Sequence, residues 1–214
     1  MGKKSRKNRR KRRLIEMGTY YDYESTSWGG WKKKEESDRK GKSCPSNTRH
    51  NPTCVYDKDG LEIWAGSKYQ SEPYAFQFGY VLNCSGTRLK SKEHRIPFKW
   101  GGKYENVAIR EIFLDWDNNE PPEIAPEFWG ELVAELKSSK TSVLVCCMGG
   151  HGRTGTALAS MLIADGWTAT EAIHYIWDIY CKDAVETQSQ VDYLKKLEES
   201  YVKKQNPMQK LPAS

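Results

Sequence analysis

A cysteine, a glycine-rich loop and an arginine follow one another in the stretch VLVCCMGGHGRTGTALAS, residues 143–160. The apolar run that ends at Cys147 predicts a buried strand, and the residues from about Arg153 onward predict a helix. In open α/β sheets, the backbone N–H groups of such a turn and the following helix N-terminus can bind an anion. Arg153 can donate two hydrogen bonds to a phosphate, and the same positive field stabilises a thiolate at Cys147. The stretch therefore has the groups that covalent phosphoryl transfer requires, with Cys147 as the nucleophile.

The residues expected to surround the phosphate are consecutive: Met148, Gly149, Gly150, His151, Gly152 and Arg153. The three glycines permit the backbone dihedral angles that an anion cradle requires. His151 either faces the substrate or fills the turn, and the hydroxyl of Thr154 is placed to stabilise the thiolate. The reaction also needs an acid that protonates the leaving oxygen and a positioned water that hydrolyses the phosphocysteine.

The pattern C-x5-R-T from Cys147 to Thr154 resembles the signature of cysteine-dependent protein tyrosine phosphatases of the dual-specificity type. Kinase-associated phosphatases of this group have a similar Cys-x-Gly-Gly-x-Gly-Arg loop. The resemblance covers about residues 61–201 and implies the phosphatase fold and a mechanism without a metal or other cofactor.

The resemblance also implies two further catalytic residues. The superfamily supplies its general acid from an upstream loop, as Asp followed four residues later by Pro, and Asp117 with Pro121 matches this pattern. Asp115 is the alternative acid, because its separation from the nucleophile suits many small dual-specificity enzymes. A glutamine on a late helix orients the hydrolytic water in this group, and Gln190 in AVETQSQVDYL is the match.

The loop departs from its relatives at two points that bear on rate and substrate. Cys146 stands where many relatives have a histidine that organises the loop, and it is otherwise a plausible core thiol. The loop has no lysine, which disfavours an inositol-lipid substrate. RNA 5′-phosphatases of the same fold favour asparagine just before the arginine, where this chain has Gly152.

Alternating strand and helix patterns predict one α/β domain, residues 54–204, with a central, mostly parallel sheet flanked by helices. Strands are expected over 61–67, 80–83, 107–116 and 141–147, with an edge segment over 95–100. Helices are expected near 73–79 and over 126–140, 154–166, 168–180 and 187–204. Thr168 and Glu171 have the spacing of a capping box, and Gly166 is expected to end the preceding helix.

The basic residues are concentrated at the N-terminus. Residues 1–13 hold nine of the 34 lysines and arginines and no acid, which leaves 25 basic against 28 acidic residues. We expect residues 1–53 to form a largely disordered extension and residues 205–214 a C-terminal tail. The basic block could contact nucleic acid, an anionic membrane surface or an import receptor, or could simply be solvated. Neither a membrane span nor a secretory signal is visible, so we expect an intracellular protein of the nucleus or cytoplasm.

The other cysteines leave alternatives open. Cys44, His50 and Cys54 are of types that bind zinc, but their spacing fits no standard finger and a fourth ligand is not evident. The other interpretation is a surface loop that packs across the domain. Cys84, which ends a predicted strand, could form a reversible disulfide with the nucleophile or be a plain buried thiol.

The sequence thus favours a protein phosphatase that acts on phosphotyrosine, with phosphoserine and phosphothreonine as possible further substrates. The alternatives are an RNA 5′-phosphatase of the same fold, which the basic N-terminus favours, and an inactive phosphate-binding module.

Overall fold

The computed structural model describes residues 44, 49–90, 93–97 and 104–205, all within one compact unit, Lys40–Ser214. Residues 1–43 and 45–48 of the expected N-terminal extension, which include the basic block, and residues 206–214 of the expected tail lie outside the described residues.

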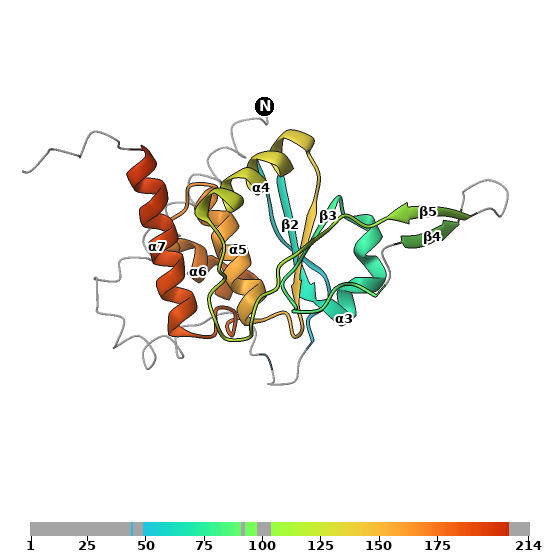
Figure 1. Cartoon of the computed structure of the whole chain (residues 1–214), viewed down its shortest axis with the longest axis horizontal. Coiled ribbons are helices and arrows are strands. Elements are labelled where there is room, and N and C mark those ends of the chain that lie inside the picture. The colour runs from blue at the N-terminus through green and yellow to red at the C-terminus, as the bar shows by residue number, and fades with distance from the viewer. Residues whose placement is uncertain (1–43, 45–48, 91–92, 98–103, 206–214) are drawn as a thin grey trace, which may run out of the picture. The chain divides into compact units, whose positions relative to one another are not determined.

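The centre of the domain is a five-stranded sheet (Figure 1). In spatial order its strands are β1 (Thr53–Lys58), β2 (Leu61–Ser67), β7 (Val143–Cys147), β3 (Tyr80–Asn83) and β6 (Glu111–Phe113). Only β1 is antiparallel to its neighbour, and the other pairs are parallel. The predicted α/β domain with a mostly parallel sheet is therefore confirmed.

The middle strand, β7, sets the position of the site. All five of its residues, VLVCC, are buried, as an apolar strand covered on both faces should be. Its register places Cys147 opposite Ser67 of β2, and Cys146 opposite Asn83 of β3. The carboxyl ends of three parallel strands therefore meet at the residue where the CX5R loop, residues 147–153, begins.

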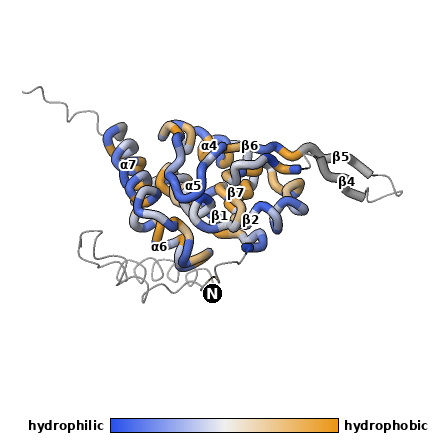
Figure 2. Tube along the Cα trace, turned by 60° about the horizontal axis from the view of Figure 1, so that its bottom comes forward, coloured by the Kyte–Doolittle hydropathy of each residue, from blue (hydrophilic) through white to orange (hydrophobic). Residues whose placement is uncertain are grey.

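Helices cover both faces of the sheet. They are α3 (Lys68–Ser71), the 3-10 helix η2 (Glu72–Gln77), α4 (Pro126–Ser139), α5 (Gly152–Ala164), α6 (Ala169–Ile179) and α7 (Gln188–Gln205). In Figure 1, α4 to α7 lie together on one side of the sheet and α3 on the other. Helix α5 is buried from Gly152 to Ile163 because it packs between the sheet and α4, α6 and α7. Figure 2 shows the contrast between the apolar β7 and the largely hydrophilic outer helix α7.

The predicted local signals at the ends of α5 and α6 are confirmed. The Thr168 hydroxyl accepts the Glu171 N–H at 3.2 Å, and the Glu171 carboxylate accepts the Thr168 N–H at 3.0 Å. Gly166 adopts a φ of 99° just after α5, a backbone conformation that glycine reaches without strain.

The strand expected over residues 107–116 is wrong in part. β5 (Tyr104–Ala108) pairs with β4 (Glu93–Pro97) in a separate two-stranded sheet, and only the three residues of β6 join the main sheet. The chain then leaves the sheet, and residues 114–117 have no regular secondary structure. The Leu114 N–H still donates to the Asn83 carbonyl of β3 at 2.9 Å, but the Trp116 carbonyl accepts its hydrogen bond from Arg153, which directs the chain from the sheet to the CX5R loop.

Within the described residues, no helix combines the length and the apolar character that a membrane span needs.

Candidate active site

The CX5R loop connects β7 directly to the N-terminus of α5. Cys147 is 4% exposed, and the N–H of Gly150 donates a hydrogen bond to its Sγ atom at 3.3 Å. Gly150 has a φ of 85°, and a Cβ atom there would lie 2.9 Å from the backbone carbon of Gly66. A thiolate at Cys147 would thus be stabilised by a backbone N–H and by the partial positive charge of the helix N-terminus.

The expectation for the loop glycines is correct only for Gly150. Gly149 and Gly152 do not adopt positive φ, so the cradle does not need them for unusual dihedral angles. At position 152 glycine is needed because there is no room for a side chain: a Cβ atom there would lie 2.2 Å from a carboxylate oxygen of Glu186. Glycine at 152 allows the turn before α7 to approach the loop.

Arg153 is buried and connects the CX5R loop to residues 115–121, the segment with the two predicted acids, which we call the acid loop. Its Nη1 atom donates a hydrogen bond to the carbonyl of Trp116 at 2.8 Å. Among the described residues, the buried Nε atom of Arg153 and the buried Oγ1 atom of Thr154 have no hydrogen-bond partner. A buried donor without an acceptor is costly, so the guanidinium is suited to a ligand that brings its own oxygen atoms.

The two candidate acids flank Trp116, whose carbonyl accepts the hydrogen bond from Arg153. Asp115 and Asp117 are exposed, whereas Trp116 between them is 4% exposed and donates its indole N–H to the Glu120 carbonyl at 2.7 Å. Both residues belong to the segments 113–117 and 120–124 that line a hollow of about 480 Å³. The structure therefore brings both predicted acids to the segment that Arg153 holds.

Gln190 contacts the same segment from α7. It is fully buried, its Oε1 atom accepts the Glu186 N–H at 2.9 Å, and its Nε2 atom donates to the Glu120 carbonyl at 3.4 Å. The Thr187 hydroxyl donates to the Asn119 carbonyl at 2.9 Å. The start of α7 thus braces the acid loop, and the predicted site residues Cys147, Arg153, Asp117 and Gln190 lie on connected segments.

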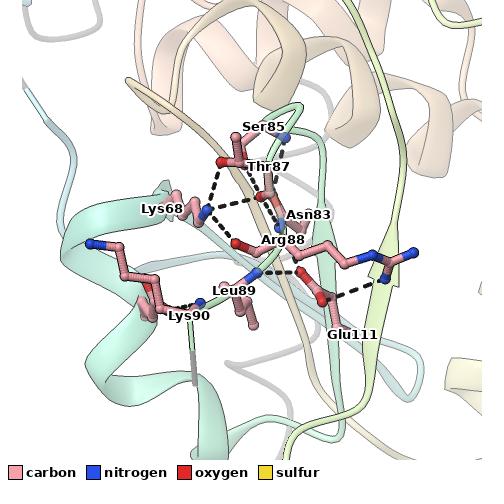
Figure 3. Close-up of polar contacts among 9 residues, drawn as sticks. Lys68, Asn83, Ser85, Thr87, Arg88, Leu89, Lys90 and Glu111 are labelled. Atoms are coloured by element: carbon pink, nitrogen blue, oxygen red, sulfur yellow. Dashed lines mark hydrogen bonds and ion pairs between the residues drawn. The ribbon is translucent and has the colours of Figure 1, made fainter. Parts of the chain in front are cut away.

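Sequence reasoning missed a buried lysine beside the site. Lys68 is 4% exposed, and Figure 3 shows its Nζ atom among oxygen atoms of the loop that follows β3. It donates to the Thr87 carbonyl at 2.8 Å, the Thr87 hydroxyl at 2.7 Å and the Arg88 carbonyl at 2.6 Å. A Cβ atom at Gly86 in this loop would lie 3.9 Å from Arg153 Nη1. Lys68 therefore fixes a loop that packs against Arg153, and no local sequence pattern marks that contact.

Replacing Lys68 with methionine is expected to lower the free energy of unfolding by about 2 kcal/mol, because the buried ammonium group loses its three hydrogen bonds to oxygen atoms of Thr87 and Arg88. The midpoint of urea denaturation measures the effect. Lys196→Met, at an exposed position of α7, is the matched control and should change stability by less than about 0.5 kcal/mol. Equal midpoints for the two variants would contradict the role given to Lys68.

The neighbouring thiols are core residues. Burial raises the pKa of Cys146 above its ordinary range, and this thiol packs with Leu144, Val81 and Ile109. Burial likewise raises the pKa of Cys84, whose N–H donates to the Cys146 carbonyl at 2.8 Å. Both side chains are therefore neutral thiols at physiological pH.

Cys44, His50 and Cys54, the three residues of zinc-binding type in one sequence segment, do not lie together. Cys54 is exposed on β1 and donates its thiol to the Tyr56 carbonyl at 3.8 Å. Cys44 and His50 lie instead with His151 of the CX5R loop and Cys181 from the turn after α6. The His151 ring therefore points toward these residues.

Comparisons with known proteins show the family of this domain. Residues 91–208 match the family model described as PTP-SAK, a Swiss Army Knife protein with a DSP-PTPase phosphatase domain. Two uncharacterized proteins of Methanocaldococcus jannaschii are each 44% identical, over 63 and 62 residues, which are 28% and 27% of this chain. Those segments cover 42% and 38% of the two relatives, so the match spans less than half of either protein.

Solved structures share the fold. The crystal structure of Tk-PTP in the active form is similar with a TM-score of 0.50 and 21% identity, over 70% of this chain and 97% of that one. PTPMT1 has a TM-score of 0.54 and 16% identity, over 74% of this chain and 99% of that one. The chain thus belongs to the PTP-SAK family, and its domain is a phosphatase domain of the dual-specificity type within the cysteine-dependent protein tyrosine phosphatase superfamily.

Proposed function

We propose that this chain is a protein phosphatase that hydrolyses phosphotyrosine through a phosphocysteine intermediate, with phosphoserine and phosphothreonine as further substrates. The observation that carries the proposal is the arrangement at the CX5R loop. A cysteine Sγ atom accepts a backbone N–H, and beside it the buried Arg153 Nε has no partner among the described residues. An oxyanion with several oxygen atoms, such as a phosphate ester, supplies the acceptors that this arrangement requires.

In the first step, the Cys147 thiolate attacks phosphorus while the bond to the substrate oxygen breaks. The loop N–H groups and Arg153 stabilise the equatorial oxygens in the transition state. Asp117 donates its proton to the leaving oxygen. Its place beside Trp116, which Arg153 holds through the Trp116 carbonyl, supports this role.

In the second step, water attacks phosphorus and the bond to sulfur breaks. The Asp117 carboxylate now accepts the proton of the water, and Gln190 orients that water. The hydrogen bond of Gln190 to the Glu120 carbonyl supports a position near the acid loop. The leaving thiolate is stabilised by the Gly150 N–H and by the Thr154 hydroxyl, which has no partner among the described residues.

Replacing Asp117 with asparagine tests the acid. We expect kcat on a phosphotyrosine peptide to fall about 10²–10⁴-fold. The loss should be smaller on p-nitrophenyl phosphate, because that leaving group is more acidic than tyrosine and needs less protonation. Asp115→Asn, two residues away and also exposed, is the matched control and should retain most of the activity.

A large loss in Asp115→Asn with little loss in Asp117→Asn would assign the acid role to Asp115. An equal loss on both substrates would contradict general-acid catalysis at Asp117. Substrate class is tested with the same preparation, by comparing phosphotyrosine and phosphoserine peptides with an inositol phospholipid and a 5′-triphosphate RNA. Faster release from RNA would overturn the protein-phosphatase proposal, and the nine basic residues at the N-terminus are the reason to include that substrate.

A further inference from the structure

Two cysteines and two histidines from distant parts of the chain meet beside the CX5R loop. They are Cys44, His50, His151 and Cys181, and their potential ligand atoms all lie within 4.8 Å of one another. Cys44 Sγ lies 3.1 Å from His50 Nε2 and 3.1 Å from Cys181 Sγ, and Cys181 Sγ lies 3.5 Å from His151 Nδ1. Each side chain therefore directs one soft or borderline ligand atom toward a common centre.

The sulfur–nitrogen distances of 3.1 and 3.5 Å approach those of a tetrahedral zinc site, whereas the two sulfur atoms, at 3.1 Å, lie closer together than a bound zinc would hold them. Zinc bonds of about 2.3 Å to sulfur and 2.0–2.1 Å to nitrogen place neighbouring ligand atoms about 3.3–3.8 Å apart. Two thiolates and two neutral imidazoles neutralise the charge of Zn²⁺, and the two thiols release their protons on binding. Four protein ligands leave no open position, which is typical of a structural site and not of a catalytic one.

The surroundings of the cluster support metal binding. The Asp183 N–H donates to Cys181 Sγ at 3.3 Å, and the Asp183 carboxylate accepts the Cys44 N–H at 3.3 Å. A backbone N–H aimed at a ligand sulfur stabilises its negative charge and fixes its orientation. Cys181 is buried and the other three ligands are half-buried, so much of the centre is shielded from solvent.

The cluster joins three segments to one another. Cys44 and His50 precede β1, Cys181 follows α6, and His151 belongs to the CX5R loop itself. Backbone hydrogen bonds also connect the segment before β1 to its neighbours. The His50 N–H donates to the Gly149 carbonyl at 3.5 Å, and the Ser67 N–H donates to the His50 carbonyl at 2.9 Å. The Tyr180 hydroxyl donates to the Gly150 carbonyl at 2.6 Å.

We propose that Cys44, His50, His151 and Cys181 bind one structural Zn²⁺ ion, which fastens the segment before β1 and the turn after α6 to the phosphate-binding loop. The ion takes no part in phosphoryl transfer. It holds His151 and, through the flanking backbone, the conformation of Gly149 and Gly150. The site stands on its own geometry and does not depend on the substrate proposed above.

The test is the metal content of the full chain, purified under reducing conditions from zinc-supplemented cells and analysed for zinc, iron and copper by mass spectrometry. We expect about one zinc per chain in the wild type and in Cys54→Ser, which removes an exposed cysteine outside the cluster. Cys44→Ser and Cys181→Ser should each hold less than about 0.1 zinc per chain. Wild-type protein without zinc, or with iron in its place, would overturn the proposal, and so would equal zinc in all four proteins.

Titration of metal-free wild type with Co²⁺ covers the case in which the ligand variants do not fold. Intense visible absorption of tetrahedral cobalt, with a thiolate-to-cobalt charge-transfer band, is expected at one equivalent, and its absence would contradict the site. Thiol counting in denaturant with EDTA distinguishes a disulfide between Cys44 and Cys181. All six cysteines should react, and a count two lower would replace the metal with a covalent bond.

Discussion

Cys147→Ser is expected to abolish turnover while the protein remains folded and still binds phosphotyrosine peptides. A serine hydroxyl in the same cradle is a far weaker nucleophile than a thiolate, and the phosphocysteine can no longer form. We expect kcat to fall at least about 10⁴-fold, the scale at which other enzymes lose activity with their nucleophile. Single-turnover assays measure the loss, and calorimetric titration with the peptide measures the binding that remains.

Cys146→Ala is the matched control, one residue earlier on the same buried strand. Burial raises the pKa of Cys146, so its neutral thiol has no nucleophilic role, and the variant should retain activity within about tenfold of the wild type. If turnover survives in Cys147→Ser, or disappears in Cys146→Ala alone, Cys147 is not the nucleophile. A wild type that binds the peptide without turnover would favour the phosphate-binding module.

The fold could be predicted from the sequence because its signals are local. The apolar run at β7, the helical spacing in α4 and the capping box at Thr168 each lie within a few residues, and each specifies one element. The sequence could also place Cys147 and Arg153 on one loop, because both belong to the short turn between β7 and α5.

What the sequence did not predict depends on residues far apart in the chain. The partners of Cys44 and His50 are His151 and Cys181, more than one hundred residues away, and no spacing rule links them. The carbonyl partners of Lys68 are likewise fixed only by tertiary structure. A parallel sheet brings strand ends together regardless of their distance in sequence, so sites at that edge are assembled by topology.

Arg153→Lys is expected to lower kcat/KM about 10³-fold, although the charge is kept. The lysine loses the planar fork that holds two phosphate oxygens. It also loses the hydrogen bond from Nη1 to the Trp116 carbonyl, which links the phosphate site to the acid loop. Arg88→Lys is the matched control, because that arginine is 58% exposed and belongs to the adjacent loop that Lys68 fixes.

A double-mutant cycle with Asp117→Asn distinguishes two roles of Arg153: phosphate binding and positioning of the acid loop. If Arg153 positions the acid loop through Trp116, removing the acid should cost much less in Arg153→Lys than in the wild type, because the carboxylate is already misplaced. Steady-state kinetics on the phosphotyrosine peptide measure the coupling, and p-nitrophenyl phosphate, which depends less on the acid, should show less of it. Additive losses on both substrates would mean that Arg153 binds phosphate but does not position the acid.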